Sequence, residues 1–140
     1  MTTIAHGIDL VDFGRIEQMI ERHGERFLDR VFTPREQADA DKVKNRIEKL
    51  AGRFAAKEAV MKLVGTGWRD GVAWTDIEVV NNPLGQPVVN LSGKVKELAD
   101  ALNLGPVALS ITHTANVAMA SALALSVTPH SGAGSASLTV

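Results

Sequence analysis

The chain has 140 residues, of which 45% are hydrophobic and 22% charged, a size and composition typical of one globular domain. Lys and Arg number 15 against 16 Asp and Glu, giving a net charge of −1, which argues against nucleic acid as a partner because such binding neutralises many phosphates. The absence of cysteine excludes disulfide frameworks, thiolate metal sites and a cysteine nucleophile.

The first residues predict a strand followed by a helix. Residues 4–11 are mostly apolar and typical of a short strand. Residues 13–23 repeat apolar side chains at helical spacing, and Gly24 is a typical helix stop. The apolar spacing continues past this glycine to Phe27 and Val31, so the chain beyond it is also expected to pack against the core.

A second helical region is predicted from a capping pattern. The motif Thr33-Pro34-Arg35-Glu36 combines an N-cap, a proline at the first helical position and a glutamate that closes a capping box. The helix that it starts is very charged, and we expect a break near Asn45 or Gly52. Residues 51–64 then predict a better buried helix, whose alanines allow close packing.

The second half of the chain predicts two pairs of strands around one helix. Residues 76–80 and 87–91 are typical of strands joined by a turn, and Ser92 is placed to cap a helix that reaches Leu102. Two last strands are predicted at residues 107–112 and 117–125. The order of strand, two helices, two strands, helix and two strands predicts an α+β fold with a mainly antiparallel sheet and packed helices.

The ends of the chain carry no membrane or export signal. No stretch approaches the roughly 18 consecutive apolar residues of a membrane-spanning helix, and the N-terminal residues do not resemble a signal peptide, so we expect a cytoplasmic protein that binds no membrane. From Ser126 onward there is no charged residue, and Ser, Gly and Ala are frequent, as in flexible ends. Residues 1–125 are predicted to form the domain and residues 126–140 a flexible tail.

The segment 53–62 is the strongest candidate for chemistry. On a helix, Glu58 precedes Lys62 by one turn, and Arg53 and Lys57 form a neighbouring row. The alanines of their helix predict that it is buried, and charges buried there are costly unless they are paired or bind a ligand. From spacing alone, a simple Glu58–Lys62 ion pair is the favoured interpretation.

Asp9 has two interpretations. It interrupts an apolar strand and could cap the helix that follows. If it instead faces Glu58, the two carboxylates would make an oxygen-rich site suited to Mg²⁺, which uses one or two protein carboxylates together with water and substrate phosphates.

Two further groups have both an ordinary and a functional interpretation. Gly65-Thr66-Gly67 either ends the helix or lets a phosphate approach the backbone amides near Lys62, although it lacks the phosphate-loop pattern. Ser110, Thr112 and His113 either form a polar strand end or supply compact contacts to a phosphate or ribose.

A basic stripe is predicted along the first helix. If the helix continues past Gly24, residues at intervals of three and four align on one face, and these are Arg15, Met19, Arg22, Arg26 and Arg30. The stripe is either a solvated face offset by neighbouring acidic residues or a docking surface for an acidic partner helix around an exposed methionine.

Together these motifs resemble the bacterial holo-acyl-carrier-protein synthases, the short class of 4′-phosphopantetheinyl transferases. The likeness spans about residues 4–125, and a hairpin-like segment at residues 76–89 adds to it. The motifs, in the order of the family, are Gly7-Ile8-Asp9-Leu10-Val11, then residues 53–62 with Gly65-Thr66-Gly67, then Ser110-Ile111-Thr112-His113. The middle motif is highly specific, and the tail has no expected counterpart in the family.

The resemblance implies transfer of the phosphopantetheine arm of coenzyme A to a serine of an acyl carrier protein, with adenosine 3′,5′-bisphosphate as the by-product and a place in fatty acid and lipid metabolism. It implies catalytic roles for three residues. Asp9 and Glu58 would bind Mg²⁺, and Lys62 would place a positive charge on the diphosphate. Glu58 would accept the serine proton, directly or through metal-bound water. The choice between these two bases and that between Mg²⁺ and Mn²⁺ stay open.

The resemblance also implies substrate contacts and an assembly. Acyl carrier proteins are small, acidic and helical, so the basic stripe gains a purpose, with charge mainly speeding encounter. The family is typically a homotrimer with active sites between subunits. The implied coenzyme A contacts are Arg53, Lys62, Gly65, Thr66, Gly67, Ser110, Thr112 and His113. The implied carrier-protein contacts are Arg15, Met19, Arg22, Arg26, Phe27 and Arg30.

Two other functions are compatible with the residues taken without the resemblance. The chain could be a non-catalytic module that docks an acidic helical protein through its basic first helix, with Glu58 and Lys62 as a buried structural pair. It could also be a sensor that binds coenzyme A or a nucleotide without transferring a group.

Overall fold

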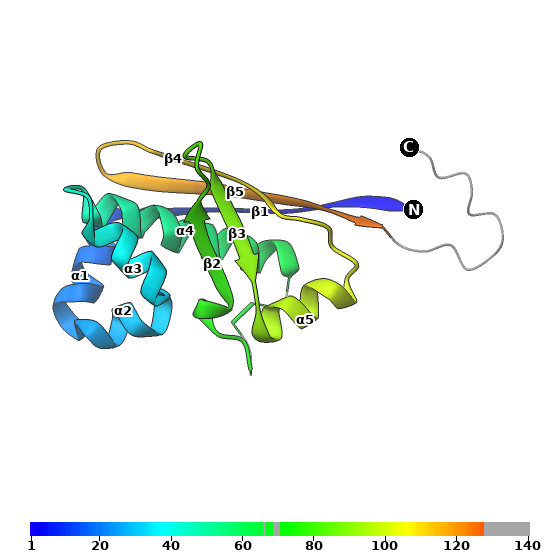
Figure 1. Ribbon diagram of the computed structural model, residues 1–140, viewed down its shortest axis with the longest axis horizontal. Helices are drawn as coiled ribbons and strands as arrows, with labels where there is room; N and C mark the ends of the chain where they lie inside the picture. Colours follow the sequence, from blue (N-terminus) through cyan, green and yellow to red (C-terminus); the bar gives the residue numbers. More distant parts are fainter. Residues whose placement is uncertain (66, 69–70, 128–140) are drawn as a thin grey trace.

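A long helix, α4 (Arg46–Val64), runs through the middle of the computed structural model, which describes residues 1–65, 67, 68 and 71–127 (Figure 1). One side of α4 is covered by a three-stranded sheet with the strand order β1-β5-β4. Its strands are β1 (Thr2–Asp12), β4 (Ala108–His113) and β5 (Val117–Val127), and each pairing is antiparallel.

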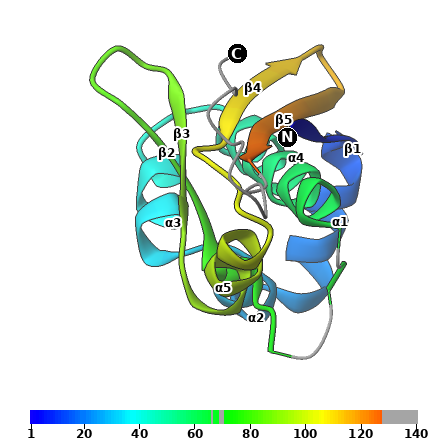
Figure 2. The same ribbon diagram turned by 90° about the vertical axis from the view of Figure 1, so that its right-hand side faces the viewer.

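A separate antiparallel hairpin lies on the other side of α4 (Figure 2). It consists of β2 (Ile77–Asn81) and β3 (Pro87–Leu91), entered through a short 3-10 turn at Trp74–Asp76. Helix α5 (Gly93–Ala101) follows the hairpin and leads back to the three-stranded sheet. The predicted α+β class with antiparallel pairing is therefore confirmed.

Three short helices gather at one end of α4 (Figure 1). They are α1 (Phe13–His23), α2 (Glu25–Val31) and α3 (Pro34–Asp41). Helix α1 has the predicted bounds, and α3 begins with the predicted capping box. The prediction of two helices before β2 is wrong, because the described residues form four α-helices there.

Two of the positions that the sequence offers as helix boundaries, Gly24 and Asn45, are boundaries in the structure. Gly24 adopts a positive φ of 54° and separates α1 from α2, so the two do not form one continuous helix. Asn45 is the N-cap of α4, whereas Gly52 lies inside this helix. A Cβ atom added to Gly52 would lie 3.1 Å from the side chain of Ile111. Of the two predicted break points, only the one near Asn45 is therefore observed.

The sheet approaches α4 closely because small residues face the helix. Four alternate alanines of β5 are buried against α4. On β1, a Cβ atom added to Gly7 would lie 1.8 Å from the backbone oxygen of Ala59 and 2.8 Å from the backbone nitrogen of Leu63. Only glycine permits this contact, which places the following residues of β1 beside the C-terminal half of α4.

The opposite face of the three-stranded sheet is mostly apolar, and the described residues do not cover it. Its large side chains alternate along β1 and β5, and the register pairs Ile4 with Leu125 and Leu10 with Met119. The exposed apolar residues of these two strands are Ile4, Ile8, Leu10, Met119, Leu123, Leu125 and Val127. A contiguous apolar surface of this kind marks an interaction site in soluble proteins.

The C-terminal boundary lies slightly beyond the predicted one. Strand β5 includes Ser126 and Val127, whose backbones pair with Thr3 and Thr2. The remainder of the predicted tail, residues 128–140, lies outside the described residues. Within the described residues, no helix combines the length and apolar character needed to cross a bilayer.

Candidate active site

Two of the residues that the resemblance implies as catalytic, Glu58 and Lys62, lie on the C-terminal half of α4, and β1 brings the third, Asp9, to Lys62. Lys62 Nζ lies 3.0 Å from Asp9 Oδ1 and donates a second hydrogen bond to the backbone oxygen of Ile8, also at 3.0 Å. The Asp9 side chain is 17% exposed and that of Lys62 is 56% exposed. The helix-cap interpretation of Asp9 is therefore wrong, because Asp12 is the N-cap of α1 and the close packing at Gly7 directs Asp9 toward α4.

Glu58 has a different partner from the one that spacing favours. Its Oε2 accepts a hydrogen bond from Trp68 Nε1 at 3.3 Å, while Lys62, one turn later, is paired with Asp9. The two carboxylates are thus anchored from separate directions, Asp9 by an ammonium and Glu58 by an indole. A buried structural Glu58–Lys62 pair, which the non-catalytic alternative required, is not what holds Lys62.

A hollow of about 280 Å³ opens beside these residues and is lined by Glu58, Met61, Lys62, Gly65, Gly67 and Trp68. Gly65 is in the left-handed conformation with a φ of 87° and ends α4, as a helix-stop glycine does. Thr66, also predicted to contact coenzyme A, lies outside the described residues. The hollow therefore combines two charged side chains, two glycines and an apolar wall.

The Asp9 and Glu58 carboxylates fit the needs of Mg²⁺. Mg²⁺ prefers oxygen ligands and is usually held by one or two carboxylates, with water and substrate phosphates completing the set. The described residues contain no cluster of three or more metal-ligating side chains, which a two-carboxylate site does not require. One oxygen of the Asp9 carboxylate, Oδ1, accepts a hydrogen bond from the Lys62 ammonium.

A second group of predicted contacts lies near the N-terminal half of α4. A hollow of about 360 Å³ there is lined by Asn45, Glu48, Lys49, Gly52, Arg53, Asn81, Gly85, Pro87, Ile111 and His113. His113 is half exposed, and its Nδ1 lies 3.2 Å from Glu48 Oε1. Ser110 lines an adjoining hollow that shares Pro87 and Ile111. Thr112 is exposed on β4 opposite Met119.

Arg53 is the unusual member of this second group. It is only 4% exposed, and its Nε and Nη2 have no hydrogen-bond acceptor among the described residues. Burial lowers the pKa of Arg53, and the charges of Glu36 and Asp39 oppose that shift. A guanidinium stays charged at neutral pH, so the free donors of Arg53 are available to hydrogen-bond an acceptor that the described residues do not supply.

The predicted coenzyme A contacts that the structure describes are therefore spread over separate hollows of the chain. Arg53 and Lys62 are nine residues apart on α4, or roughly 13 Å along its axis at 1.5 Å per residue. The hollow at Lys62 and the hollow at Arg53 share no lining residue. One subunit alone does not gather the whole predicted contact set into one cavity.

The fully buried charges of α4 belong to a structural pair. Lys57 Nζ lies 2.8 Å from Glu36 Oε1, and both side chains are inaccessible to solvent. Lys57 also donates to the backbone oxygens of Trp74 and Ile77, and Glu36 accepts from the backbone nitrogens of Thr33 and Val79. Burial lowers the pKa of Lys57, and Glu36 opposes this shift. The network ties α3, α4 and β2 together.

The predicted docking residues are divided between two helices. Arg15, Met19 and Arg22 lie on α1, and the residues beyond Gly24 lie on α2. A hollow of about 220 Å³ at the α1–α2 junction is lined by Met19, His23, Arg26, Phe27 and Arg30. Phe27 is 5% exposed and packs on other core rings, as its place in the apolar spacing predicted, and it also lines this hollow.

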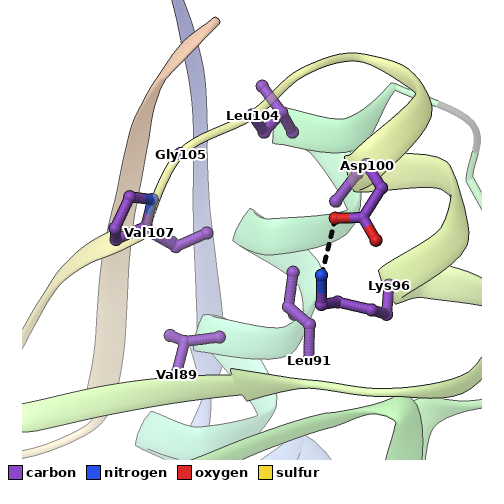
Figure 3. Close-up of a pocket in the computed structure, with 9 residues that line it drawn as sticks. Val89, Leu91, Lys96, Asp100, Leu104, Gly105 and Val107 are labelled. Carbon is purple, nitrogen blue, oxygen red and sulfur yellow. Dashed lines mark hydrogen bonds and ion pairs between the residues drawn. The ribbon is translucent and has the colours of Figure 1, made fainter.

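Figure 3 shows another hollow, of about 270 Å³, that contains none of the predicted site residues. It lies between β3, α5 and the segment that leads to β4, with the Lys96–Asp100 ion pair at 2.6 Å on one side. Its other labelled side chains are apolar, namely Val89, Leu91, Leu104 and Val107.

Sequence reasoning missed three residues of these sites. Trp68 carries no pattern that links it to Glu58, because its contact depends on the path of the loop after α4. Glu36 was visible only as part of a capping box, which it does form. Glu48, the partner of His113, lies 65 residues away in the chain, and no local spacing connects them.

Comparison with known proteins agrees with these motifs. Residues 5–117 match the family model described as the 4′-phosphopantetheinyl transferase superfamily. A holo-[acyl-carrier-protein] synthase of Solibacter usitatus is 47% identical over 117 residues, covering 84% of this chain and 94% of that protein. The one from Koribacter versatilis is 45% identical with the same coverage.

Solved structures of the same class superpose well on this chain. The Helicobacter pylori holo-[acyl-carrier-protein] synthase in complex with coenzyme A is 33% identical with a TM-score of 0.75, over 85% of this chain and 98% of that chain. The Neisseria meningitidis enzyme is 30% identical with a TM-score of 0.79, over 86% of this chain and 96% of that chain. This protein therefore belongs to the 4′-phosphopantetheinyl transferase superfamily and is an enzyme of its holo-[acyl-carrier-protein] synthase family.

Proposed function

We propose that this enzyme transfers the 4′-phosphopantetheine arm of coenzyme A to a serine of an apo-acyl carrier protein, in a Mg²⁺-dependent reaction that releases adenosine 3′,5′-bisphosphate and serves fatty acid biosynthesis. The observation that carries the proposal is that Lys62 pairs with Asp9 and, together with Glu58, lines a hollow that also contains two glycines. Relatives solved in complex with coenzyme A, including that of Helicobacter pylori, support the choice of donor.

The chemistry asks for charge neutralisation and in-line positioning. The serine oxygen forms a new bond to the phosphorus next to the pantetheine, and the bond from that phosphorus to the bridging oxygen of the diphosphate breaks. Glu58 accepts the serine proton, directly or through a water, and Lys62 moves its charge from Asp9 to the diphosphate. Asp9 and Glu58 would hold the divalent cation. When bound, Mg²⁺ neutralises the diphosphate as a Lewis acid.

The remaining contacts are assigned by their place in the two hollows. Lys62 and the glycines Gly65 and Gly67, with Thr66, are proposed to contact the diphosphate. The orphaned donors of Arg53 favour a phosphate of the nucleotide end, with His113 beside it. Ser110 and Thr112 are proposed to contact the same end from β4.

We further propose a homotrimer in which each active site spans two subunits. Two observations support it: the uncovered apolar face of the β1-β5-β4 sheet, and the separation of the Lys62 and Arg53 hollows within one chain. In this arrangement the hollow containing Glu58 and Lys62 on one subunit faces that containing Arg53 and His113 on the next. Such a head-to-tail contact closes into a ring.

Mixed assemblies test the shared site. Glu58→Gln and Arg53→Met subunits are each expected to be inactive, but co-expressed together they should regain up to about a quarter of wild-type activity, the fraction of head-to-tail interfaces that pair two intact halves by chance. The measurement is the specific activity of the co-purified mixture. Activity no higher than the mean of the two parents would place each site within one chain.

Carrier docking is assigned to the basic residues of α1 and α2. Their hollow is lined in part by Met19, which is half-buried and not exposed as expected, and it suits an apolar side chain of an acidic helix. Arg15→Glu combined with Arg22→Glu should raise the KM for the carrier protein about tenfold or more at low salt, because electrostatic steering is reversed. The KM for coenzyme A should change less than about twofold, and the effect should shrink as salt screens the charges.

A charge-matched control separates docking from net charge. Arg35→Glu combined with Lys94→Glu makes the same change at exposed positions on α3 and α5, and it should leave both KM values near wild type. An equal rise in the carrier KM from both double variants would remove the docking surface from α1 and α2.

Transfer itself is tested by mass spectrometry of an apo-carrier protein incubated with coenzyme A, Mg²⁺ and the enzyme. The expected result is a carrier mass increased by one phosphopantetheine group, dependent on Mg²⁺. Binding of coenzyme A without any mass change would instead support the sensor function. Carriers from different pathways in the same assay would define the substrate range.

A further inference from the structure

Trp68 links the loop after α4 to the proposed catalytic carboxylate. Its indole Nε1 donates to Glu58 Oε2 at 3.3 Å, and its ring forms part of the hollow that also contains Lys62. An indole N–H can only donate a hydrogen bond, and this one is donated to a single oxygen of the Glu58 carboxylate.

The indole is held in place by a stack of three rings. The centroids of Trp68 and Trp74 are 3.8 Å apart with an interplanar angle of 19°, and those of Trp74 and Phe54 are 4.9 Å apart at 27°. Phe54 is 3% exposed and lies on α4 one turn before Glu58. Ring stacking adds to burial in fixing ring positions.

The stack therefore begins and ends on the same helix. It leaves α4 at Phe54, crosses Trp74 and Trp68, and returns to α4 at Glu58. The backbone oxygen of Trp74 accepts from the buried Lys57, at 3.2 Å, on the intervening turn. The donor that meets Glu58 is thus fixed relative to the helix that carries Glu58.

We propose that Trp68 is a positioning residue of the transferase: its indole N–H restricts the rotation of the Glu58 carboxylate and presents the other oxygen toward the cation and the serine. The inference rests on the proposed role of Glu58. A long, partly exposed glutamate has several side-chain conformers, and partners that orient a metal ligand change metal affinity by about 10- to 100-fold when removed.

The first test compares two conservative variants. Trp68→Phe keeps a ring for stacking but removes the N–H, whereas Trp74→Phe changes the neighbouring ring without touching the bond to Glu58. We expect Trp68→Phe to raise the Mg²⁺ concentration for half-maximal activity at least tenfold, with both substrate KM values within about twofold of wild type. Trp74→Phe should keep the wild-type Mg²⁺ requirement, and circular-dichroism melting should show both variants folded.

The second test reads the contact without turnover. The chain contains 2 tryptophans, Trp68 and Trp74, so in Trp74→Phe the tryptophan fluorescence comes from Trp68 alone. Titration of this variant with Mg²⁺, without substrates, should change the emission, and the change should disappear when Glu58→Gln is added. No change in the emission of the single-tryptophan variant would overturn the contact between Trp68 and the cation-binding carboxylate.

The outcomes distinguish this inference from the function beneath it. A wild-type Mg²⁺ requirement in Trp68→Phe, together with an inactive Glu58→Gln, would overturn the positioning role and leave the transferase site standing. An active Glu58→Gln would remove the catalytic role of Glu58 and the positioning role with it.

Discussion

Replacement of Glu58 by glutamine should lower the turnover of phosphopantetheine transfer by about 10²- to 10⁴-fold, the range in which a proton-accepting group contributes. Glutamine keeps the size of the side chain and an oxygen that can accept the hydrogen bond that Trp68 Nε1 donates at 3.3 Å in the wild type. The change removes the negative charge that the cation and the serine proton need. The loss should therefore appear in kcat, with the melting temperature unchanged.

The measurement is steady-state transfer over a range of Mg²⁺ concentrations, with melting followed in parallel. Glu97→Gln is the control, because it removes an exposed carboxylate of α5 by the same chemical change, and its kcat should stay within about twofold of wild type. Near-normal turnover of Glu58→Gln would contradict the assignment of Glu58 to the reaction.

Replacement of Lys57 by methionine should lower the free energy of unfolding by about 3–5 kcal/mol, as removal of one partner from a buried ion pair does. Glu36 would keep the two backbone donors of Thr33 and Val79 but lose its countercharge, at 2.8 Å, in a site inaccessible to solvent. The backbone oxygens of Trp74 and Ile77 would lose their ammonium donor as well.

Urea unfolding followed by circular dichroism, at one protein concentration, measures this loss. Lys96→Met is the matched control, since the Lys96–Asp100 pair joins the same groups at the surface (Figure 3), with side chains 52% and 60% exposed, and should cost about 0–1 kcal/mol. The double variant Lys57→Met with Glu36→Gln should lose less than the sum of the single losses. Equal losses from Lys57→Met and Lys96→Met would show that the buried pair does not anchor the fold.

Local signals explain why much of the fold could be predicted. Capping by Thr33 and Glu36 and the stop at Gly24 depend on residues within a few positions, and the structure has both. The number of helices before β2 was wrong because separate helices begin after both Gly24 and Asn45, namely α2 and α4. Gly52 was an ambiguous signal, because a glycine can either interrupt a helix or allow close packing. In the structure it lies inside α4, where Ile111 of β4 packs closely against it.

The site was predictable in its residues but not in its pairings. Asp9 and Lys62 lie 53 positions apart in the chain, and only the motif resemblance suggested that they act together. Spacing favoured a Glu58–Lys62 pair, whereas the buried pair is Lys57 with Glu36, 21 positions away. Which charged side chain of α4 is buried depends on the elements that pack against the helix, and helical spacing does not reveal those elements.

The close contact of Gly7 with α4 has a consequence for anyone who would rebuild this chemistry in another protein. Asp9 reaches Lys62 because the strand carrying it lies against the backbone of Ala59 and Leu63, with no room for a single methyl group between them. A designer who grafts only the charged side chains onto a different scaffold would reproduce the chemical groups at the wrong separation. The transferable unit is the strand–helix spacing, and its sequence signature is a residue with no side chain at all.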